Sequence, residues 1–336
     1  MPRPRPGSTD RDPAGPLTYA AAGVDIPAYT AMLERVKPLI AATQGAEVVT
    51  GVGPFAGLYT LPGGGGCLAA SADGVGTKTK VAVAYGQHRG IGHDLVNHCV
   101  NDIATAHARP LFFLDYFASG HLDASVFEQV MAGLTEACAV NGCALLGGET
   151  AEMPGVYGLG DYDLAGFVVG HVPLDLVTHH EAPRAGDLLV GLPSSGLHTS
   201  GFSLVREVFE GVSLDTVLPE LGRPLGEELL EPHRSYLAEL RRLPWKAAAH
   251  VTGGGLADNV PRALPEGLAA ELDRSAWRVP AIFDLLARRG HIDGDEMLST
   301  FNMGLGMVLV TAEPILGYPV VGRVLERAAG PRVAFR

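Results

Sequence analysis

Hydrophobic positions recur along the chain with two spacings, one typical of helices and one typical of strands. Apolar side chains at helical spacing predict a helix over residues 28–41, which Pro38 is expected to kink or end. Two strand-like runs follow at 55–61 and 68–72, and the PGGGG between them is typical of a hairpin tip rather than a phosphate loop. The chain therefore opens with a helix and a β-hairpin.

Strands and helices alternate in the next section. A helix over 91–108 leads to an apolar strand over 110–119, after which Asp123 caps another helix. The strand CALLGG and a strand near 163–172 complete the section. Alternation of this kind predicts an α/β domain that spans residues 17–172.

The pattern restarts after a boundary expected between residues 172 and 187, so residues 173–336 form a second predicted domain. The fold class is therefore α/β, or α+β, in two domains. Residues 1–16 are rich in Pro, Gly and charge and are expected to be a disordered tail. The second domain has predicted strands at 188–193, 248–252, 268–272, 305–311 and 318–324 and predicted helices at 201–210, 233–242 and 255–264.

Composition narrows the class of protein. A length of 336 residues suits two domains, and 47% hydrophobic with 18% charged residues is a globular composition. The sequence has no apolar run of about 18 residues and no secretory signal, so a cytoplasmic protein without a membrane partner is expected. The net charge of −12 argues against a nucleic-acid partner. The four cysteines stand singly, as buried thiols do.

Common nucleotide and hydrolase motifs are missing, including the Walker P-loop, GxGxxG after a strand, HExxH and GxSxG. What remains is the loop DGVGTK between an apolar strand and a helical run. Gly74, Gly76 and Thr77 can present backbone N–H groups to an anion. Asp73 can bind Mg²⁺, and Lys78 can neutralise a phosphate. An ordinary strand-to-helix turn with an Asp cap is an equally common interpretation of this loop.

The predicted helix after this loop carries an unusual set of polar residues. Asp94, His98, Asn101 and Asp102 recur at spacings that place most of them on one side of the helix. Asp and Asn are poor choices for a helix interior. A solvated face is the alternative, but it would more naturally contain Glu, Lys and Arg, so a functional role is favoured.

Further carboxylates fall on or near predicted strands. Asp115 interrupts the apolar run FFLDYF, where a carboxylate is costly unless it is paired or binds a metal. Glu149 and Glu152 are expected just past a strand end, where open α/β sheets bind ligands. So many oxygen ligands near one site require divalent cations, and Mg²⁺ is favoured over zinc.

Two loops in the second half are typical of anion binding at the start of a helix. One is SSGLHTSG, which contains His198, and the other is HVTGGG, which begins at His250 and contains Thr252, Gly253 and Gly254. Two such loops suit a phosphorylated substrate. For each histidine, a supporting hydrogen bond is favoured over direct proton transfer.

These motifs together resemble one enzyme family over most of the chain, from Leu17 to about Val324. The runs YAAAGVDI, DGVGTK, IGHDLVNHCVNDI, PLFFLDY, GGETAEMPG, SSGLHTSGFSLVR, HVTGGGLADNVPRALP and FNMGLGM are similar to phosphoribosylformylglycinamidine cyclo-ligase, also called aminoimidazole ribonucleotide synthetase. Segments like DGVGTK also occur in relatives such as thiamine-monophosphate kinase, selenophosphate synthetase and a hydrogenase maturation protein. The combination of LFFLDY, GGETAEMPG and HVTGGG is specific to the cyclo-ligase.

The resemblance implies a homodimer in which the mixed sheets of two N-terminal domains pair into a barrel, each followed by a C-terminal α/β sandwich. It implies a ligase of purine biosynthesis that uses ATP and Mg²⁺ to convert formylglycinamidine ribonucleotide into aminoimidazole ribonucleotide, ADP and phosphate. Another ATP-using relative, such as a small-molecule kinase, is the alternative function. A non-catalytic scaffold is the least favoured alternative, since the acidic residues are all present.

Residue roles follow from the same resemblance. Asp73, Asp94 and Asp102 would hold Mg²⁺ and ATP together with Lys78. The predicted catalytic residues are Asp102, His198 and His250, and the predicted ATP-binding residues are Lys37, Asp73, Gly74, Gly76, Thr77, Lys78, Asp94, Asp115, Glu149, Thr252, Gly253 and Gly254.

Two features depart from the family pattern. Ser200 stands where the family usually has Asn, and a shorter donor there is expected to need a bridging water. Only residues 312–317 separate the last two strand-like runs, too few for the crossover helix that parallel neighbours need. The last strand is therefore expected to turn back, lie at a sheet edge or stay loose.

Overall fold

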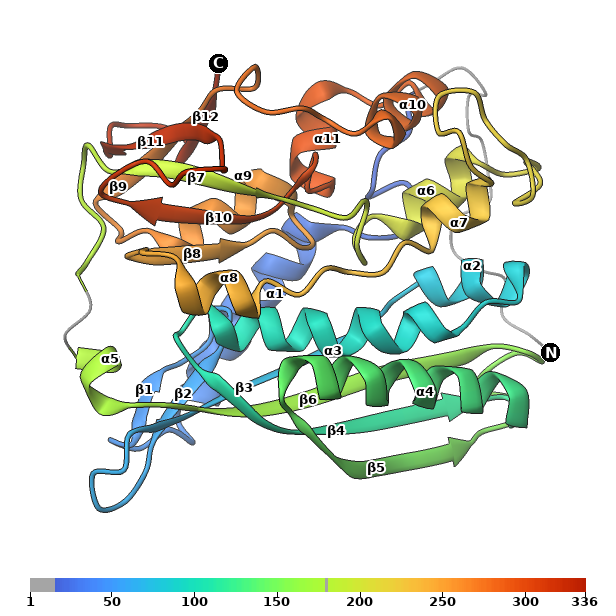
Figure 1. The fold of residues 1–336 in the computed structure, drawn as a ribbon, viewed down its shortest axis with the longest axis horizontal. Coiled ribbons are helices and arrows are strands. Elements are labelled where there is room, and N and C mark those ends of the chain that lie inside the picture. The colour runs from blue at the N-terminus through green and yellow to red at the C-terminus, as the bar shows by residue number, and fades with distance from the viewer. Residues whose placement is uncertain (1–15, 179–180) are drawn as a thin grey trace.

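A computed structural model describes residues 16–178 and 181–336. These residues form two six-stranded sheets, with α3 between the first sheet and the second half of the molecule (Figure 1). The predicted α/β fold class with a mixed N-terminal sheet is confirmed. The predicted disordered tail lies, apart from Pro16, outside the described residues. In the described part of the chain, no helix is long and apolar enough to cross a membrane.

The first sheet has the strand order β1-β2-β3-β6-β4-β5, and only its β4–β5 pair is parallel. The predicted hairpin is confirmed, because β2 and β3 pair antiparallel on either side of the PGGGG tip. The helices and strands of this half are α1 (Ile26–Ala41), β1 (Val48–Thr50), β2 (Gly57–Thr60), β3 (Cys67–Gly74), α2 (Lys78–Tyr85), α3 (Arg89–Ala104), β4 (Arg109–Ser119), α4 (Ala124–Asn141), β5 (Ala144–Glu152) and β6 (Tyr162–Val172).

Pro38 lies inside helix α1, so the helix does not end there, and a kink at Pro38 stays a prediction. None of its residues is buried in the single chain, so its apolar stripe faces solvent. Helices α3 and α4 lie on one face of the first sheet (Figure 1). Exposed apolar side chains also come from the strands of this sheet, namely Tyr59, Leu111, Leu114, Leu146 and Phe167.

The second sheet has the order β12-β9-β11-β7-β10-β8. The predicted helix over 233–242 is shorter than expected and begins only at Leu237, because the backbone of residues 233–236 bonds to side chains of α3 instead. The elements of this half are α5 (Leu174–Thr178), β7 (Leu188–Pro193), α6 (Phe202–Val208), α7 (Leu225–Leu229), α8 (Leu237–Arg242), β8 (Ala247–His250), α9 (Gly255–Asn259), a 3₁₀ turn (Val260–Ala263), β9 (Leu268–Leu272), α10 (Ala281–Gly290), α11 (Gly294–Thr300), β10 (Leu305–Thr311), β11 (Val320–Glu326) and β12 (Val333–Phe335).

The position expected for the last predicted strand was wrong. Strand β11 lies inside the sheet, antiparallel to both β7 and β9. Strand β10 pairs with the other side of β7, so β10 and β11 run in the same direction without being neighbours. The connection over residues 312–319 needs no helix, because an extended segment of that length reaches about 25 Å and can return along β7. The sheet edge is instead occupied by β12, which the sequence pattern did not predict.

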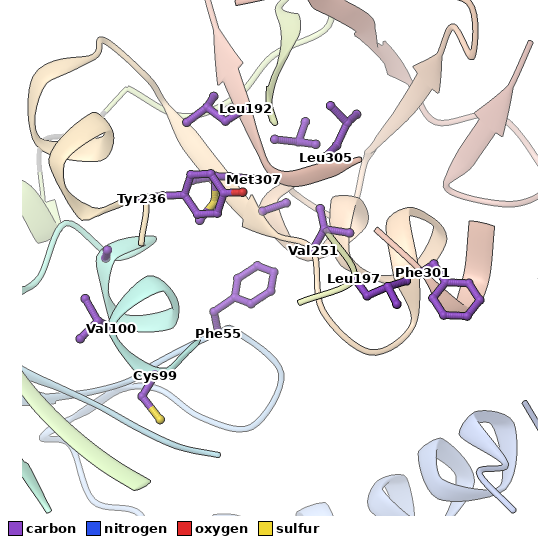
Figure 2. Close-up of a cluster of buried hydrophobic side chains, with 14 of the residues drawn as sticks. Phe55, Cys99, Val100, Leu192, Leu197, Tyr236, Val251, Phe301, Leu305 and Met307 are labelled. Carbon is purple, nitrogen blue, oxygen red and sulfur yellow. The ribbon is translucent and has the colours of Figure 1, made fainter. Parts of the chain in front are cut away.

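One continuous cluster of buried apolar residues runs through both halves. Figure 2 shows Phe55, from the loop before β2, among Cys99 and Val100 of α3 and Tyr236 and Val251 of the second half. The two sheets therefore share a core, and α3 is buried on both sides.

Arg262 fastens the loop before β2 to the second half. Its guanidinium lies 3.8 Å from the centre of the Phe55 ring. It donates hydrogen bonds to the carbonyl oxygens of Gly53 at 3.0 Å and Pro54 at 3.1 Å, and to Asn259 Oδ1 at 2.9 Å. A planar cation with several donors suits this combination of stacking and hydrogen bonding.

Candidate active site between the two sheets

The polar side of α3 faces the second half of the protein rather than solvent. Asn97 Nδ2 donates to the carbonyl oxygen of His233 at 2.7 Å, and Asn101 Nδ2 donates to that of Arg234 at 2.9 Å. Asn101 Oδ1 accepts from the backbone N–H of Tyr236 at 2.7 Å. The unusual polar residues of this helix therefore hold the segment over residues 231–236, and a solvated face is excluded.

Lys78 and Asp94 form an ion pair in which both side chains are 0% exposed. Lys78 Nζ lies 2.8 Å from each Asp94 oxygen and donates to the carbonyl oxygen of Glu231 at 2.8 Å. Asp94 Oδ1 also accepts from the backbone N–H of His233 at 2.7 Å. Burial raises the pKa of Asp94 and lowers that of Lys78. In this structure the two residues neutralise each other beneath the segment that contains Glu231 and His233.

Four buried histidines gather where the two halves meet, and we call them the histidine centre: His98, His198, His233 and His250. His98 lies on α3, whereas the other three come from the second half. The ring of His233 is 5.3 Å from that of His98 and 5.0 Å from that of His250, centre to centre. It stacks on His198 at 3.9 Å with an interplanar angle of 18°.

Two aspartates of the first half orient two of these rings. Asp73 Oδ2 lies 2.7 Å from His98 Nε2, and Asp102 Oδ1 lies 2.7 Å from His250 Nδ1. Ser71 Oγ donates to the second oxygen of Asp102 at 3.0 Å. These contacts connect the end of β3 to α3, and the C-terminal end of α3 to the end of β8, so the site draws on both sheets.

The charge of the histidine centre is uneven. Burial disfavours the imidazolium form of His98, but the adjacent Asp73 carboxylate outweighs it and raises the pKa of His98 to about 9. Burial lowers the pKa of His250 and takes the pKa values of His198 and His233 well below the ordinary range. One charged ring therefore lies among three neutral ones.

The residues that could hold a metal include His98, Asp102 and His250, whose ligand atoms lie within 4.8 Å of one another. The three predicted metal ligands differ in access to solvent. The side chain of Asp73 is 36% exposed and that of Asp102 is 10% exposed, whereas Asp94 is fully buried against Lys78. Asp73 and Asp102 therefore have oxygens that suit a hard cation arriving from solvent.

The predicted glycine loops lie beside this centre. Asp73 and Gly74 end β3, Gly76 has a φ of +67°, and Thr77 Oγ1 lies 3.2 Å from Ser203 Oγ of α6. The DGVGTK loop thus touches the second half.

The loop after His250 is held from within. Asn259 Nδ2 donates to the carbonyl oxygens of Thr252, Gly253 and Gly255 at 3.3, 3.1 and 2.8 Å. Gly254 has a φ of +92°, and a Cβ at Gly253 would meet no atom within 4 Å. The backbone at Gly253 is therefore open to a ligand.

Three predicted ATP-binding residues lie on other parts of the fold. Lys37 is on the exposed helix α1 and pairs with Glu34. Glu149 lies inside β5, not past its end as expected, and is exposed. Asp115 shares a row of the sheet with Asp73, separated by β6, which is about 10 Å at the usual strand spacing.

His233 was missed by sequence reasoning. The sequence pattern predicted a helix over 233–242, which placed His233 in a regular helix and gave no signal of its contacts with α3. His98 was noticed as part of the polar helix but was given no role. Ser200, where the family usually has Asn, is buried in the same loop as His198.

Comparisons with known proteins identify the family of this chain. The AIR synthase related protein family models match residues 53–172 for the N-terminal domain and 184–315 for the C-terminal domain. A phosphoribosylformylglycinamidine cyclo-ligase of Myxococcus xanthus (strain DK1622) is 51% identical over 306 residues, which cover 88% of this chain and 89% of the relative. The chain belongs to the phosphoribosylformylglycinamidine cyclo-ligase family.

Other cyclo-ligase relatives support the assignment. The enzyme of Sorangium cellulosum (strain So ce56) is 49% identical, with 88% of each chain covered. The human trifunctional purine biosynthetic protein adenosine-3 is 47% identical over 342 residues, which cover 94% of this chain and 34% of that protein. The predicted enzyme class, a C–N bond-forming ligase of purine biosynthesis, is thereby confirmed.

Solved structures similar to this chain show the fold. AaThiL complexed with AMPPCP and TMP superposes with a TM-score of 0.67 at 16% identity, covering 93% of this chain and 95% of that one. The hydrogenase maturation protein HypE in complex with ATP gives a TM-score of 0.58 at 18% identity, covering 93% and 92%. At these identities the likeness does not favour the kinase alternative over the cyclo-ligase.

Proposed function

We propose that this chain closes the imidazole ring of aminoimidazole ribonucleotide at the junction of its two sheets. ATP phosphorylates the formyl amide oxygen of formylglycinamidine ribonucleotide, the amidine nitrogen attacks the activated carbon, and phosphate leaves. The observation that carries the proposal is the pair of Asp–His contacts, Asp73 with His98 and Asp102 with His250, flanked by glycine loops from both halves. Positioning and charge neutralisation dominate phosphoryl transfer, and this arrangement suits both.

The nucleotide phosphates are proposed to lie against the DGVGTK loop, with the backbone amides of Gly76 and Thr77 as donors. The backbone N–H of Gly74 instead donates to Asp73 Oδ1 at 2.8 Å. Asp73 and Asp102 are proposed to hold Mg²⁺, which offsets phosphate charge when bound. Asp94, a third predicted ligand, is occupied by Lys78. Both residues act from beneath the site, by fixing the loop against the segment over 231–236.

Hydrogen bonds of the buried histidines are proposed to support the loops that face the substrate. His250 holds a proton on Nδ1 for the Asp102 carboxylate, and His198 Nε2 is held by the backbone N–H of Ser195 at 3.2 Å. The open backbone at Gly253 is available to the phosphate of the ribonucleotide. Roles for Lys37, Asp115 and Glu149 stay predictions, since the structure places them on other elements.

Substitution of Asp102 by Asn tests the metal and histidine assignments together. The variant keeps the size of the side chain but loses the charge that faces His250 and the proposed cation. We expect ADP release with formylglycinamidine ribonucleotide to fall at least about 100-fold across a MgCl₂ titration, in line with the loss of a charge-stabilising group. Undiminished Mg²⁺-dependent ring closure would show that the assignment is wrong, and ATP turnover without ring closure would instead favour a kinase.

A cytoplasmic homodimer is also proposed. The first sheet leaves Phe167, Leu114 and Tyr59 exposed at 46%, 38% and 47%, although each lies on a strand of a packed sheet. Exposed apolar side chains of this extent mark an interaction surface. A second copy of the same sheet would cover them and close the barrel that the resemblance implies.

A further inference from the structure

His233 is a buried histidine for which neither the sequence motifs nor the proposed reaction provides a role. Its side chain is completely buried, and its Nε2 lies 3.0 Å from His250 Nε2. Its ring stacks on His198 at 3.9 Å. It is therefore in contact with both histidines that the motifs predicted to be catalytic.

The backbone around His233 is held rigidly from α3. Asp94 Oδ1 accepts its N–H at 2.7 Å, and Asn97 Nδ2 donates to its carbonyl oxygen at 2.7 Å. The carbonyl oxygens of Glu231 and Arg234, on either side, accept from Lys78 Nζ and Asn101 Nδ2. These hydrogen bonds fix the backbone of His233 and so restrict the position of its ring, whereas a ring on an unsupported loop could move.

The hydrogen-bond partners determine which nitrogen carries each proton. A carboxylate only accepts, so His250 Nδ1 must donate to Asp102. Among the described residues, Nδ1 of His233 has no hydrogen-bond partner, so a proton there would be a buried donor without an acceptor. His233 therefore carries its proton on Nε2 and donates it to His250 Nε2, which lies 3.0 Å away and accepts. Nδ1 of His233 is left as a lone pair.

We propose that His233 is a positioning residue for His250, and that its Nε2–H keeps the His250 ring in the orientation that donates Nδ1–H to Asp102. The opposite tautomer of His250 would set two N–H groups against each other and leave Asp102 without its donor. The catalytic consequence rests on the proposed function of His250, whereas the tautomer itself does not. Asp102, His250 and His233 thus form a chain of oriented groups from α3 to the segment over 231–236.

Two variants separate the hydrogen bond from the packing of the ring. His233→Phe keeps an aromatic ring to stack on His198 but has no donor. His233→Gln places an amide N–H near the position of Nε2 but has no ring. We expect kcat for ring closure to fall about 10–100-fold in H233F with KM for both substrates within threefold, as is usual when a partner that orients a functional histidine is lost. H233Q should retain most of the wild-type kcat, and exposed His121→Gln should match wild type.

The tautomer is read directly by ¹⁵N NMR of histidine-labelled protein, with the His250 signals assigned by their loss in His250→Asn. We expect the Nδ1–H tautomer in wild type and H233Q, and a mixture of tautomers in H233F. An unchanged tautomer in H233F, or equal kcat losses in H233F and H233Q, would overturn the proposal. Should H233F fail to fold, His233→Met takes its place with the same criteria. If wild type does not close the ring, the proposed function fails while the NMR result still decides the role of His233.

Discussion

Replacing Asp94 by Asn removes one partner of an ion pair whose side chains are both 0% exposed. Lys78 then keeps one neutral acceptor, the carbonyl oxygen of Glu231 at 2.8 Å, and its ammonium loses its counter-charge. Breaking a buried pair from one side costs about 3–5 kcal/mol, because a charge is left uncompensated in the interior. The Asn amide oxygen can still accept from the backbone N–H of His233, so about 3 kcal/mol, the lower end, is expected.

The free energy of unfolding would be measured by urea denaturation of wild type, D94N, Lys78→Met and the double variant K78M/D94N. The double variant should be more stable than D94N, because it no longer buries an unpaired charge. As a surface control, Glu34→Gln removes the partner of exposed Lys37 and should change stability by less than about 1 kcal/mol. A loss below about 1 kcal/mol in D94N, or a double variant no more stable than D94N, would refute the reasoning.

Other expected outcomes test the loops and surfaces. Gly255→Ala should destabilise the protein by roughly 1–3 kcal/mol in thermal unfolding. The φ of Gly255 is +57°, and a Cβ there would lie 2.2 Å from the carbonyl oxygen of Leu298 in α11. Gly253→Ala is the near-neutral control, because a Cβ at Gly253 would meet no atom within 4 Å. Phe167→Asp should convert the proposed dimer to a monomer in light scattering while the circular dichroism spectrum stays unchanged. Leu316→Asp, at a fully exposed position, should leave the dimer intact. A dimeric F167D would exclude this face of the sheet as the interface. Arg262→Lys should speed amide exchange over residues 53–57, because the forked donor is lost; unchanged exchange contradicts this.

Much of the fold and part of the site could be predicted from the amino-acid sequence. Apolar periodicity identified the hairpin and most strands and helices, because burial on one side of an element leaves a local pattern. Glycines in the sequence identified the turns of the DGVGTK and HVTGGG loops. In the structure, Gly76 and Gly254 have the positive φ that such turns require. The polar residues of α3 marked it as unusual before any contact was known.

Tertiary structure decided how these residues are partnered. In the sequence, Asp94 was one of several carboxylates along the chain. Its partners in the structure are Lys78 and the backbone N–H of His233, and His233 is 139 positions away in sequence. His233 lay in a stretch with helical periodicity, and it lies in the histidine centre because side chains of α3 bind the backbone on either side of it. Strand β11 lies inside the sheet because it pairs with the side of β7 that β10 leaves unpaired. Local pattern reports which side of an element is buried, but the partner of a buried polar group is set by packing between distant segments.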